Sequence, residues 1–295
     1  MSAAVSPGVR RIVLDADGAA LSALLCEPEH GPARAVVVAL HGGGTSASYF
    51  DGQADPDQSL LTLGARLGYT VLAVDRPGYR GSAGQFPDGQ RLADQAGTVR
   101  AALRDFTARH APGAGLFLLG HSLGGKLALG LAADPDGLDL VGLDVSGCGH
   151  EYAVDPRDIV APGGKLWRHH WGPVRLYPPD TFRAGGQVVA PMPDREKADA
   201  IAWAEDFAAL APRVRVPLRL TFAEYEAWWR HDDRALSDLA ARFTAAPRVL
   251  VDRQPQAGHN ISLGWAARPY HLRALAFLAD CLAARAAAGP TRTAA

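Results

Sequence analysis

Short, continuous apolar runs recur along this chain and alternate with segments of helical spacing. The runs, rich in Val and Leu, occupy residues 35–40, 70–74, 116–119, 138–145, 218–222 and 249–251. The helical segments lie at 59–67, 92–110, 123–132, 232–243 and 269–287. Strands that are buried on both faces have continuous apolar sequences, as in a parallel sheet covered by helices. The alternation therefore predicts a mostly parallel, doubly wound α/β sheet.

Two further segments depart from this alternation. Near the N-terminus, residues 11–14 and 21–25 flank an Asp- and Gly-containing turn, which predicts a pair of strands. Residues 148–212 are longer than a strand–helix crossover needs and contain a single good helical stretch, 196–210. This interval is rich in aromatic residues: Trp167, Trp171, Tyr177, Phe182, Trp203 and Phe207. We interpret it as a lid (cap) inserted between core strands; the alternative is an insertion that merely packs on the sheet.

These segments define the expected domain organisation. Residues 1–147 and 213–288 are predicted to form the core domain, 148–212 the lid, and 289–295 a disordered, Ala- and Thr-containing tail. A formal net charge of -1 gives no electrostatic reason to expect nucleic acid or an anionic membrane as a partner. The sequence has no apolar stretch of about 18 residues and no recognisable signal peptide, so a cytoplasmic protein is expected.

Residue usage excludes other classes of site. The cysteines at positions 26, 148 and 281 are odd in number and widely separated, which indicates neither a disulfide framework nor a zinc site. No dinucleotide or phosphate-binding glycine pattern is present, so neither cofactor nor metal is expected. The preference for Arg over Lys, with abundant Ala, is typical of GC-rich bacterial genomes.

The segment Gly120-His121-Ser122-Leu123-Gly124 connects an apolar strand to an Ala-rich helix and matches the pattern G-x-S-x-G. A strand that reverses sharply into a helix places its central residue at positive φ, and the chain passes so close that only glycine fits on either side. Such a turn exposes the Ser122 hydroxyl beside the free N–H groups of the helix N-terminus. The sequence thus predicts Ser122 as a nucleophile.

With this turn and three further motifs, nearly the whole chain resembles the α/β-hydrolase superfamily. Residues 36–44, which end in His41-Gly42-Gly43-Gly44, resemble the strand and loop that supply the oxyanion hole. Residues 71–82 resemble the D-x-P-G-x-G-x-S turn of the family, and Gly258-His259-Asn260 resembles the loop with the catalytic histidine. The motifs occur in the family's order. The resemblance implies an α/β-hydrolase fold with a serine esterase- or thioesterase-like site, without assigning a subfamily.

A serine hydroxyl needs a base, and histidine titrates in the right range. His259 follows the last apolar run, which agrees with the order Ser, acid, His along the chain. Of the other histidines, His41 is expected to be structural, and His169 and His170 to lie in the lid. His121 is expected to point away from the nucleophile, although it is retained as a candidate substrate contact.

The acid that orients the base is expected after the run 218–222. The segment 216–226 resembles the penultimate-strand motif that usually ends in G-x-x-D, which places Glu226 in the position of the aspartate. Glutamate is longer by one methylene but can orient an imidazole equally well, so a Ser-His-Glu triad is predicted. Glu224 is the alternative acid, and Asp232, Asp233 and Asp144 are more distant candidates.

The oxyanion hole is expected to combine the backbone N–H of Leu123 with that of Gly43, with Gly44 or Gly42 as alternatives. Asp75 is expected to brace its turn rather than to take part in catalysis. Candidate substrate contacts are Gly44, His121, Trp167, Trp171 and Trp203.

A serine nucleophile favours attack on a carbonyl group. We therefore expect hydrolysis of a carboxylic ester or thioester of a medium-sized apolar small molecule, through an acyl-serine intermediate. One alternative uses the same triad for acyl transfer, cyclisation, or C–C or lyase chemistry in a biosynthetic pathway. Another is a non-catalytic binding protein on this fold. The sequence leaves a homodimer open.

Overall fold

The computed structural model describes residues 4–159 and 167–289. In these residues, eight strands form one sheet in the order β1-β2-β4-β3-β5-β6-β7-β8. The strands are β1 (Arg10–Ala16), β2 (Ala19–Cys26), β3 (Val36–Leu40), β4 (Thr70–Val74), β5 (Leu116–His121), β6 (Leu140–Ser146), β7 (Leu218–Tyr225) and β8 (Val249–Gly258). The helices are α1 (Leu60–Arg66), α2 (Leu92–Arg109), α3 (Leu123–Ala133), α4 (Pro156–Ile159), α5 (Trp167–Trp171), α6 (Thr181–Val188), α7 (Asp194–Leu210), α8 (Asp233–Ala241) and α9 (Ala267–Ala287).

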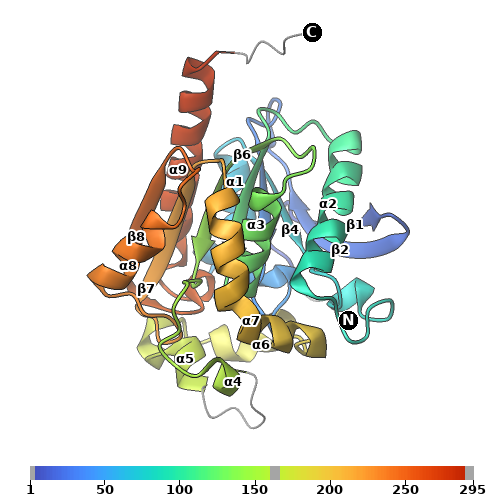
Figure 1. Ribbon diagram of the computed structural model, residues 1–295. Coiled ribbons are helices and arrows are strands. Elements are labelled where there is room, and N and C mark those ends of the chain that lie inside the picture. The colour runs from blue at the N-terminus through green and yellow to red at the C-terminus, as the bar shows by residue number, and fades with distance from the viewer. Residues whose placement is uncertain (1–3, 160–166, 290–295) are drawn as a thin grey trace.

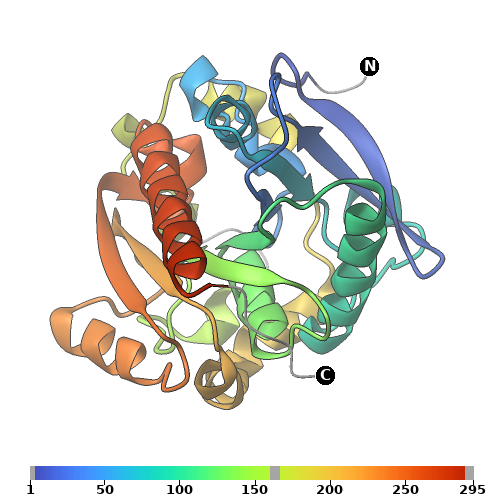
Figure 2. The same cartoon turned by 90° about the horizontal axis from the view of Figure 1, so that it is seen from above.

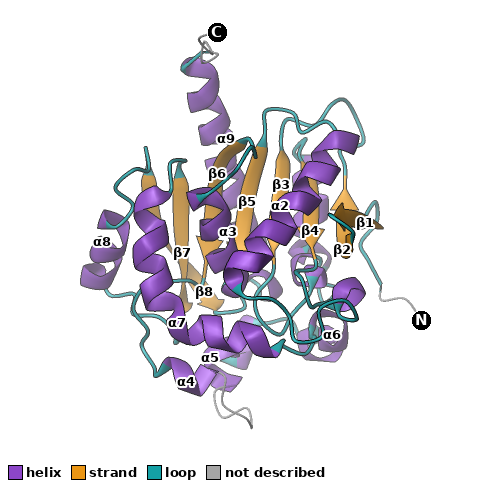
Figure 3. Ribbon diagram, turned by 45° about the vertical axis from the view of Figure 1, so that its right-hand side comes forward, coloured by secondary structure: helices purple, strands orange, loops and turns teal. Residues whose placement is uncertain are grey.

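The sheet is mostly parallel, as the continuous apolar runs predict. Only β2 runs antiparallel to its neighbours, β1 and β4, and every other adjacent pair is parallel. Figure 3 shows the strands side by side with helices around them. Strand β8 continues seven residues beyond the predicted end at Val251, to Gly258. Because β8 is the last strand of the sheet, several of its residues are only half-buried and need not be apolar.

Helices cover both faces of the sheet and enclose a separate apolar core on each face. Helices α2, α3 and α8 lie on one face, and α1 and α9 lie on the other (Figure 2). Strand β3 contributes to both cores, since Val36 and Val38 belong to one and Val37 and Ala39 to the other. This is the alternation expected of a central strand, whose successive side chains point to opposite faces.

Part of the segment 148–212 lies at one end of the sheet, while α7 packs against α3 and places Trp203 and Phe207 in the core of that face. In Figures 1 and 3, α4, α5 and α6 gather beyond the ends to which the parallel strands point. The predicted helix at 196–210 is present as α7, but the short helices α4, α5 and α6 were not predicted. Since α6 contains Gly185 and Gly186, its local sequence is a weak helix signal.

No helix within residues 4–159 and 167–289 has both the length and the apolar character to cross a lipid bilayer. The predicted disordered tail, 289–295, lies outside the described residues from position 290 onward.

A buried histidine in α9 should make the fold sensitive to acid. His271 is 0% exposed, and its Nε2 lies 3.0 Å from Ser262 Oγ. Burial lowers the pKa of His271 to about 3, so between pH 6.5 and 3 the unfolded chain binds a proton that the folded chain does not. The free energy of unfolding must therefore fall as the pH falls through this range.

The variant His271→Leu lacks this group. Between pH 7 and pH 4.5, we expect its free energy of unfolding to decrease by about 2–3 kcal/mol less than that of the wild type. Urea denaturation at the two pH values measures this difference, in which any pH-independent cost of the substitution cancels. The exposed His30 provides a matched control, His30→Leu, which should behave as the wild type. An equal loss for His271→Leu and the wild type would contradict the prediction.

Candidate active site

Ser122 lies at the sharp turn between β5 and α3. Its backbone has φ 52° and ψ -118°, which confirms the predicted positive φ. The flanking glycines are required by close packing: a Cβ at Gly120 would lie 2.6 Å from the carbonyl oxygen of Gly124, and a Cβ at Gly124 would lie 2.0 Å from that of Leu40. A strained, non-glycine residue held by such packing is typical of functional sites.

His259 and Glu226 meet beside this turn. The Nδ1 atom of His259 lies 2.8 Å from Oε2 of Glu226, and both side chains are buried. The other carboxylate oxygen of Glu226 accepts the backbone N–H groups of Ala227 (3.1 Å) and Trp228 (2.9 Å). Although burial by itself raises the pKa of Glu226, the charge and hydrogen bond of His259 and the N–H of Trp228 hold this pKa below its ordinary value. Glu226 is therefore an anion facing the imidazole.

The other acidic candidates lie elsewhere. Glu224 accepts the backbone N–H of Gln256, and Asp232 accepts that of Ala235. Asp144 forms an ion pair with Arg219, and Asp233 forms one with Arg253. Among the acids considered from the sequence, Glu226 is thus the one that contacts His259.

Ser122 and His259 line one cavity of about 240 Å³. Its wall combines backbone of the glycine loop with aromatic, polar and apolar side chains: Gly42, Gly43, Gly44, Thr45, His121, Ser122, Leu123, Lys126, Tyr152, His170, Met192, Ala200, Trp228, Trp229, His259 and Asn260. This volume is below the range of about 300–1,000 Å³ that is common for sites of drug-sized ligands. The cavity is therefore small for a ligand site.

The predicted substrate contacts divide into two groups. Gly44 and His121 are part of the cavity wall, and His121 stacks on Tyr49. Trp171 packs instead against other aromatic rings of the segment 148–212, and Trp203 is fully buried behind the wall, where its Nε1 donates to the carbonyl of Gly149 at 2.7 Å. The side chain of Trp167 lies outside the described residues.

Seven residues of the cavity wall were not singled out from the sequence: Thr45, Lys126, Tyr152, Met192, Ala200, Trp228 and Trp229. Lys126 had a usable signal, since it follows Ser122 by four residues in a helix and so lies on the same helical face. Trp228 and Trp229 follow Glu226 by two and three residues. Tyr152 and Met192 come from loops whose paths only the tertiary structure defines.

The glycine loop at residues 42–44 approaches the helix that begins at Leu123. A Cβ at Gly43 would lie 2.6 Å from Leu123 Cδ1, so a larger residue there would displace the end of this leucine side chain. The N–H of Gly44 already donates to the hydroxyl of Tyr79 at 3.1 Å. The N–H of Gly43 has no acceptor among the described residues, which favours Gly43 over Gly44 as an oxyanion donor.

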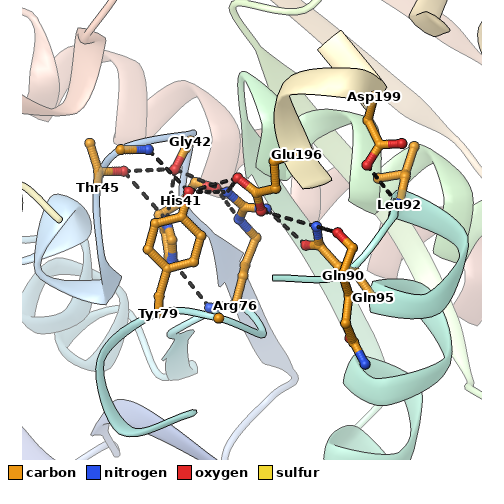
Figure 4. A network of polar contacts seen from close by, with 12 residues as sticks. His41, Gly42, Thr45, Arg76, Tyr79, Gln90, Leu92, Gln95, Glu196 and Asp199 are labelled. Carbon is orange, nitrogen blue, oxygen red and sulfur yellow. Dashed lines mark hydrogen bonds and ion pairs between the residues drawn. The ribbon is translucent and has the colours of Figure 1, made fainter. Parts of the chain in front are cut away.

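A buried polar network holds the glycine loop from behind (Figure 4). The Arg76 guanidinium donates to the backbone carbonyls of His41 (2.8 Å) and Gly42 (3.2 Å). It also forms a buried ion pair with Glu196 of α7, which accepts the hydroxyl of Tyr79 at 2.6 Å. One carboxylate from the segment 148–212 is thereby connected, through Arg76, to the loop that borders Ser122.

This network predicts a large cost for Glu196→Gln. The substitution leaves the Arg76 guanidinium buried without a counter-charge, which should lower the free energy of unfolding by about 3–5 kcal/mol. Chemical denaturation measures this loss. Asp194→Asn, on the same helix, removes an exposed ion pair with Lys197 and should cost far less. Similar losses for the two variants would show that the buried pair has no special importance.

Two further histidines border the cavity without adding charge. Burial, together with the neighbouring His259, lowers the pKa of His121 well below its ordinary value. The same two causes lower the pKa of His170 to about 4. Both rings are therefore neutral near pH 7, and His259 is the one that has a carboxylate partner.

The sequence matches the alpha/beta hydrolase family over residues 37–280. No curated protein matches the sequence. A highly thermostable carboxyl esterase from Bacillus coagulans, solved in complex with glycerol, is similar in structure, with a TM-score of 0.70 and 15% sequence identity. The alignment covers 94% of this chain and 100% of that chain. An enol-lactonase from Burkholderia xenovorans LB400 has 17% identity, with 91% and 100% covered and a TM-score of 0.67. A soluble variant of monoglyceride lipase from Saccharomyces cerevisiae, in complex with a substrate analogue, has 17% identity, with 92% and 94% covered and a TM-score of 0.66.

At these identities the solved structures establish a shared fold, and the family match establishes common descent over most of the sequence. The eight-stranded, mostly parallel sheet agrees with both. The chain belongs to the alpha/beta hydrolase family.

Proposed function

We propose that this chain is a serine hydrolase that cleaves a carboxylic ester or thioester through an acyl-Ser122 intermediate. The contact between His259 and Glu226, at the cavity that Ser122 also lines, is the observation that supports this most directly. A buried carboxylate that accepts a hydrogen bond from Nδ1 fixes the tautomer of the imidazole. The Nε2 atom of His259 is then free to accept the proton of the serine hydroxyl.

The proposed reaction has two halves. Ser122 Oγ attacks the carbonyl carbon while its proton passes to His259 Nε2, and the N–H groups of Gly43 and Leu123 stabilise the oxyanion. Collapse of this intermediate breaks the bond to the alcohol or thiol, which leaves with the proton from His259. Water then attacks the acyl-serine with the same base, releasing the acid and restoring the serine hydroxyl.

The cavity supports a small or medium-sized substrate with an apolar part. Its wall includes the aromatic residues Tyr152, Trp228 and Trp229 and the thioether of Met192. The segment 148–212 contributes Tyr152, His170, Met192 and Ala200 to this wall, and we propose that it acts as a lid that helps to exclude bulk water. Two of the proteins that share the fold are named a carboxyl esterase and an enol-lactonase. Both names describe the cleavage of an ester bond, which is the chemistry proposed for this chain.

A fluorophosphonate probe tests the proposal directly. We expect stoichiometric labelling, which peptide mass spectrometry should locate at Ser122, and turnover of a panel of 4-nitrophenyl esters and acyl thioesters of increasing chain length. Product analysis in water then distinguishes hydrolysis from acyl transfer, because only hydrolysis gives the free acid. A chain that neither reacts with the probe nor cleaves any ester would be better described as a binding protein on this fold.

A further inference from the structure

Lys126 is a buried lysine in the wall of the candidate active site. It lies on α3, four residues after Ser122, and is 2% exposed. Lysine is almost never fully buried unless it has a partner, because removing an ammonium group from water is costly. Its presence at the cavity therefore calls for a functional or structural reason.

The surroundings of Lys126 satisfy its charge only in part. Its Nζ atom donates to the hydroxyl of Tyr152 at 2.8 Å, and this hydroxyl in turn donates to the carbonyl of Ala200 at 2.7 Å. The rings of Trp203, Trp229 and Tyr152 lie 5.0, 5.5 and 5.5 Å from Nζ. Aromatic faces attract a cation but are not strong hydrogen-bond acceptors, and an ammonium group has three donors. Tyr152 accounts for one of them.

A carboxylate partner is missing from the part of the chain that the structure describes. No Asp or Glu oxygen there lies within ion-pair distance of Nζ, and none of the residues in the cavity wall is acidic. Asp199, Asp206 and Glu196 act on Lys126 from farther away, and of these Asp199 pairs with Arg91 and Glu196 with Arg76. Burial lowers the pKa of Lys126 to about 8, so the ammonium form still predominates at neutral pH.

We propose that Lys126 binds a carboxylate of the substrate, so that the enzyme prefers esters carrying a second, ionised carboxyl group. The inference rests on the proposed function, since it assigns the substrate class of that same cavity. A single ammonium group, in a wall with no other lysine or arginine, suits a singly charged carboxylate. Phosphate groups, by contrast, are usually held by several converging donors.

Two pairs of esters test where the carboxylate lies. Mono-4-nitrophenyl glutarate against 4-nitrophenyl pentanoate compares a charged with a neutral acyl chain of equal length. For the alcohol side, 4-acetoxybenzoate is compared with its methyl ester. In the wild type, we expect kcat/KM to favour the anionic member of one pair by about 10- to 100-fold, the size of a charge-assisted hydrogen bond.

Lys126→Met keeps the length of the side chain and its apolar contacts but removes the ammonium group. In the wild type, the ratio of kcat/KM for the anionic ester to that for the neutral ester is expected to be about 10 to 100. In this variant, we expect the ratio to fall to about 1. Lys197→Met is the matched control, because Lys197 is exposed on α7 and pairs with Asp194; it should keep the wild-type ratio. A ratio that survives in Lys126→Met would overturn the assignment.

A second measurement needs no variant, in case Lys126→Met does not fold. Glutaramate, the monoamide of glutaric acid, should slow the fluorophosphonate labelling of the wild type more strongly than the uncharged diamide, glutaramide, at equal ionic strength. Equal protection by the anionic and the neutral compound, or equal turnover of the members of both ester pairs, would refute the role of Lys126 and leave the proposed function intact. Absence of both ester turnover and labelling in the wild type would instead refute the proposed function.

Discussion

Replacement of Ser122 by alanine is expected to lower kcat for ester hydrolysis by about 10⁴- to 10⁶-fold, as for nucleophile substitutions in enzymes with a serine triad. The substitution removes the attacking oxygen, and the remaining N–H groups and His259 can only assist direct attack by water. Steady-state turnover of the best 4-nitrophenyl ester measures the loss. Labelling by a fluorophosphonate should disappear completely, since the variant has no acceptor for the phosphonyl group at this turn.

The control for this experiment is a serine of no mechanistic interest. Ser237 is exposed on α8, and Ser237→Ala should keep both turnover and labelling. Circular dichroism and thermal unfolding of Ser122→Ala should match the wild type closely enough to exclude unfolding as the cause. Turnover or labelling that persists at the wild-type rate would mean that another residue is the nucleophile.

The sheet could be predicted because its strands are buried on both faces. Val36–Leu40 and Thr70–Val74 have no exposed residue, so every residue in them except Thr70 is apolar and their limits are easily found. The same reasoning fails for β8, because an edge strand tolerates polar residues from Asp252 to Gln256. Where burial is incomplete, hydrophobic pattern no longer marks the length of a strand.

The turn at Ser122 was predictable for a different reason. Its glycines are dictated by contacts within a few residues or with the adjacent strand, and these leave a local sequence pattern. The wall of the cavity leaves no such pattern. Tyr152 and Met192 reach it through loops and short helices that are stabilised by tertiary contacts, and Trp203, expected to contact substrate, lies behind the wall next to Lys126. Side-chain roles of this kind depend on the path of the whole segment.

The network of Figure 4 illustrates the same limit. Arg76 and Glu196 are 120 residues apart, and neither the turn after β4 nor the sequence of α7 indicates that they meet. His41 was expected to be structural, and both of its ring nitrogens contact backbone atoms of this network. Its Nδ1 lies 2.8 Å from the carbonyl oxygen of Gly42, and its Nε2 accepts the backbone N–H of Arg76 at 3.0 Å. Burial and the nearby Arg76 lower the pKa of His41, which keeps the ring neutral as this arrangement requires.

The identity of the acid gives the second large effect. Glu226→Gln preserves the size of the side chain and an oxygen that can accept the N–H groups of Ala227 and Trp228. An amide nitrogen facing His259 Nδ1 would, however, donate to it and favour the tautomer that carries its proton on Nε2. That tautomer cannot accept the serine proton, so kcat should fall by about 10³- to 10⁴-fold.

Glu224→Gln is the matched control, since Glu224 is exposed, lies two residues earlier and accepts the backbone N–H of Gln256 at 2.7 Å. We expect this variant to keep kcat within about twofold, because surface substitutions away from special contacts have small effects. Steady-state kinetics on one ester, with fluorophosphonate labelling rates as a second readout, compare the two. A greater loss in Glu224→Gln than in Glu226→Gln would transfer the role of the acid to Glu224. Comparable, small losses in both would mean that His259 acts without a carboxylate, and that the 2.8 Å contact with Glu226 is structural.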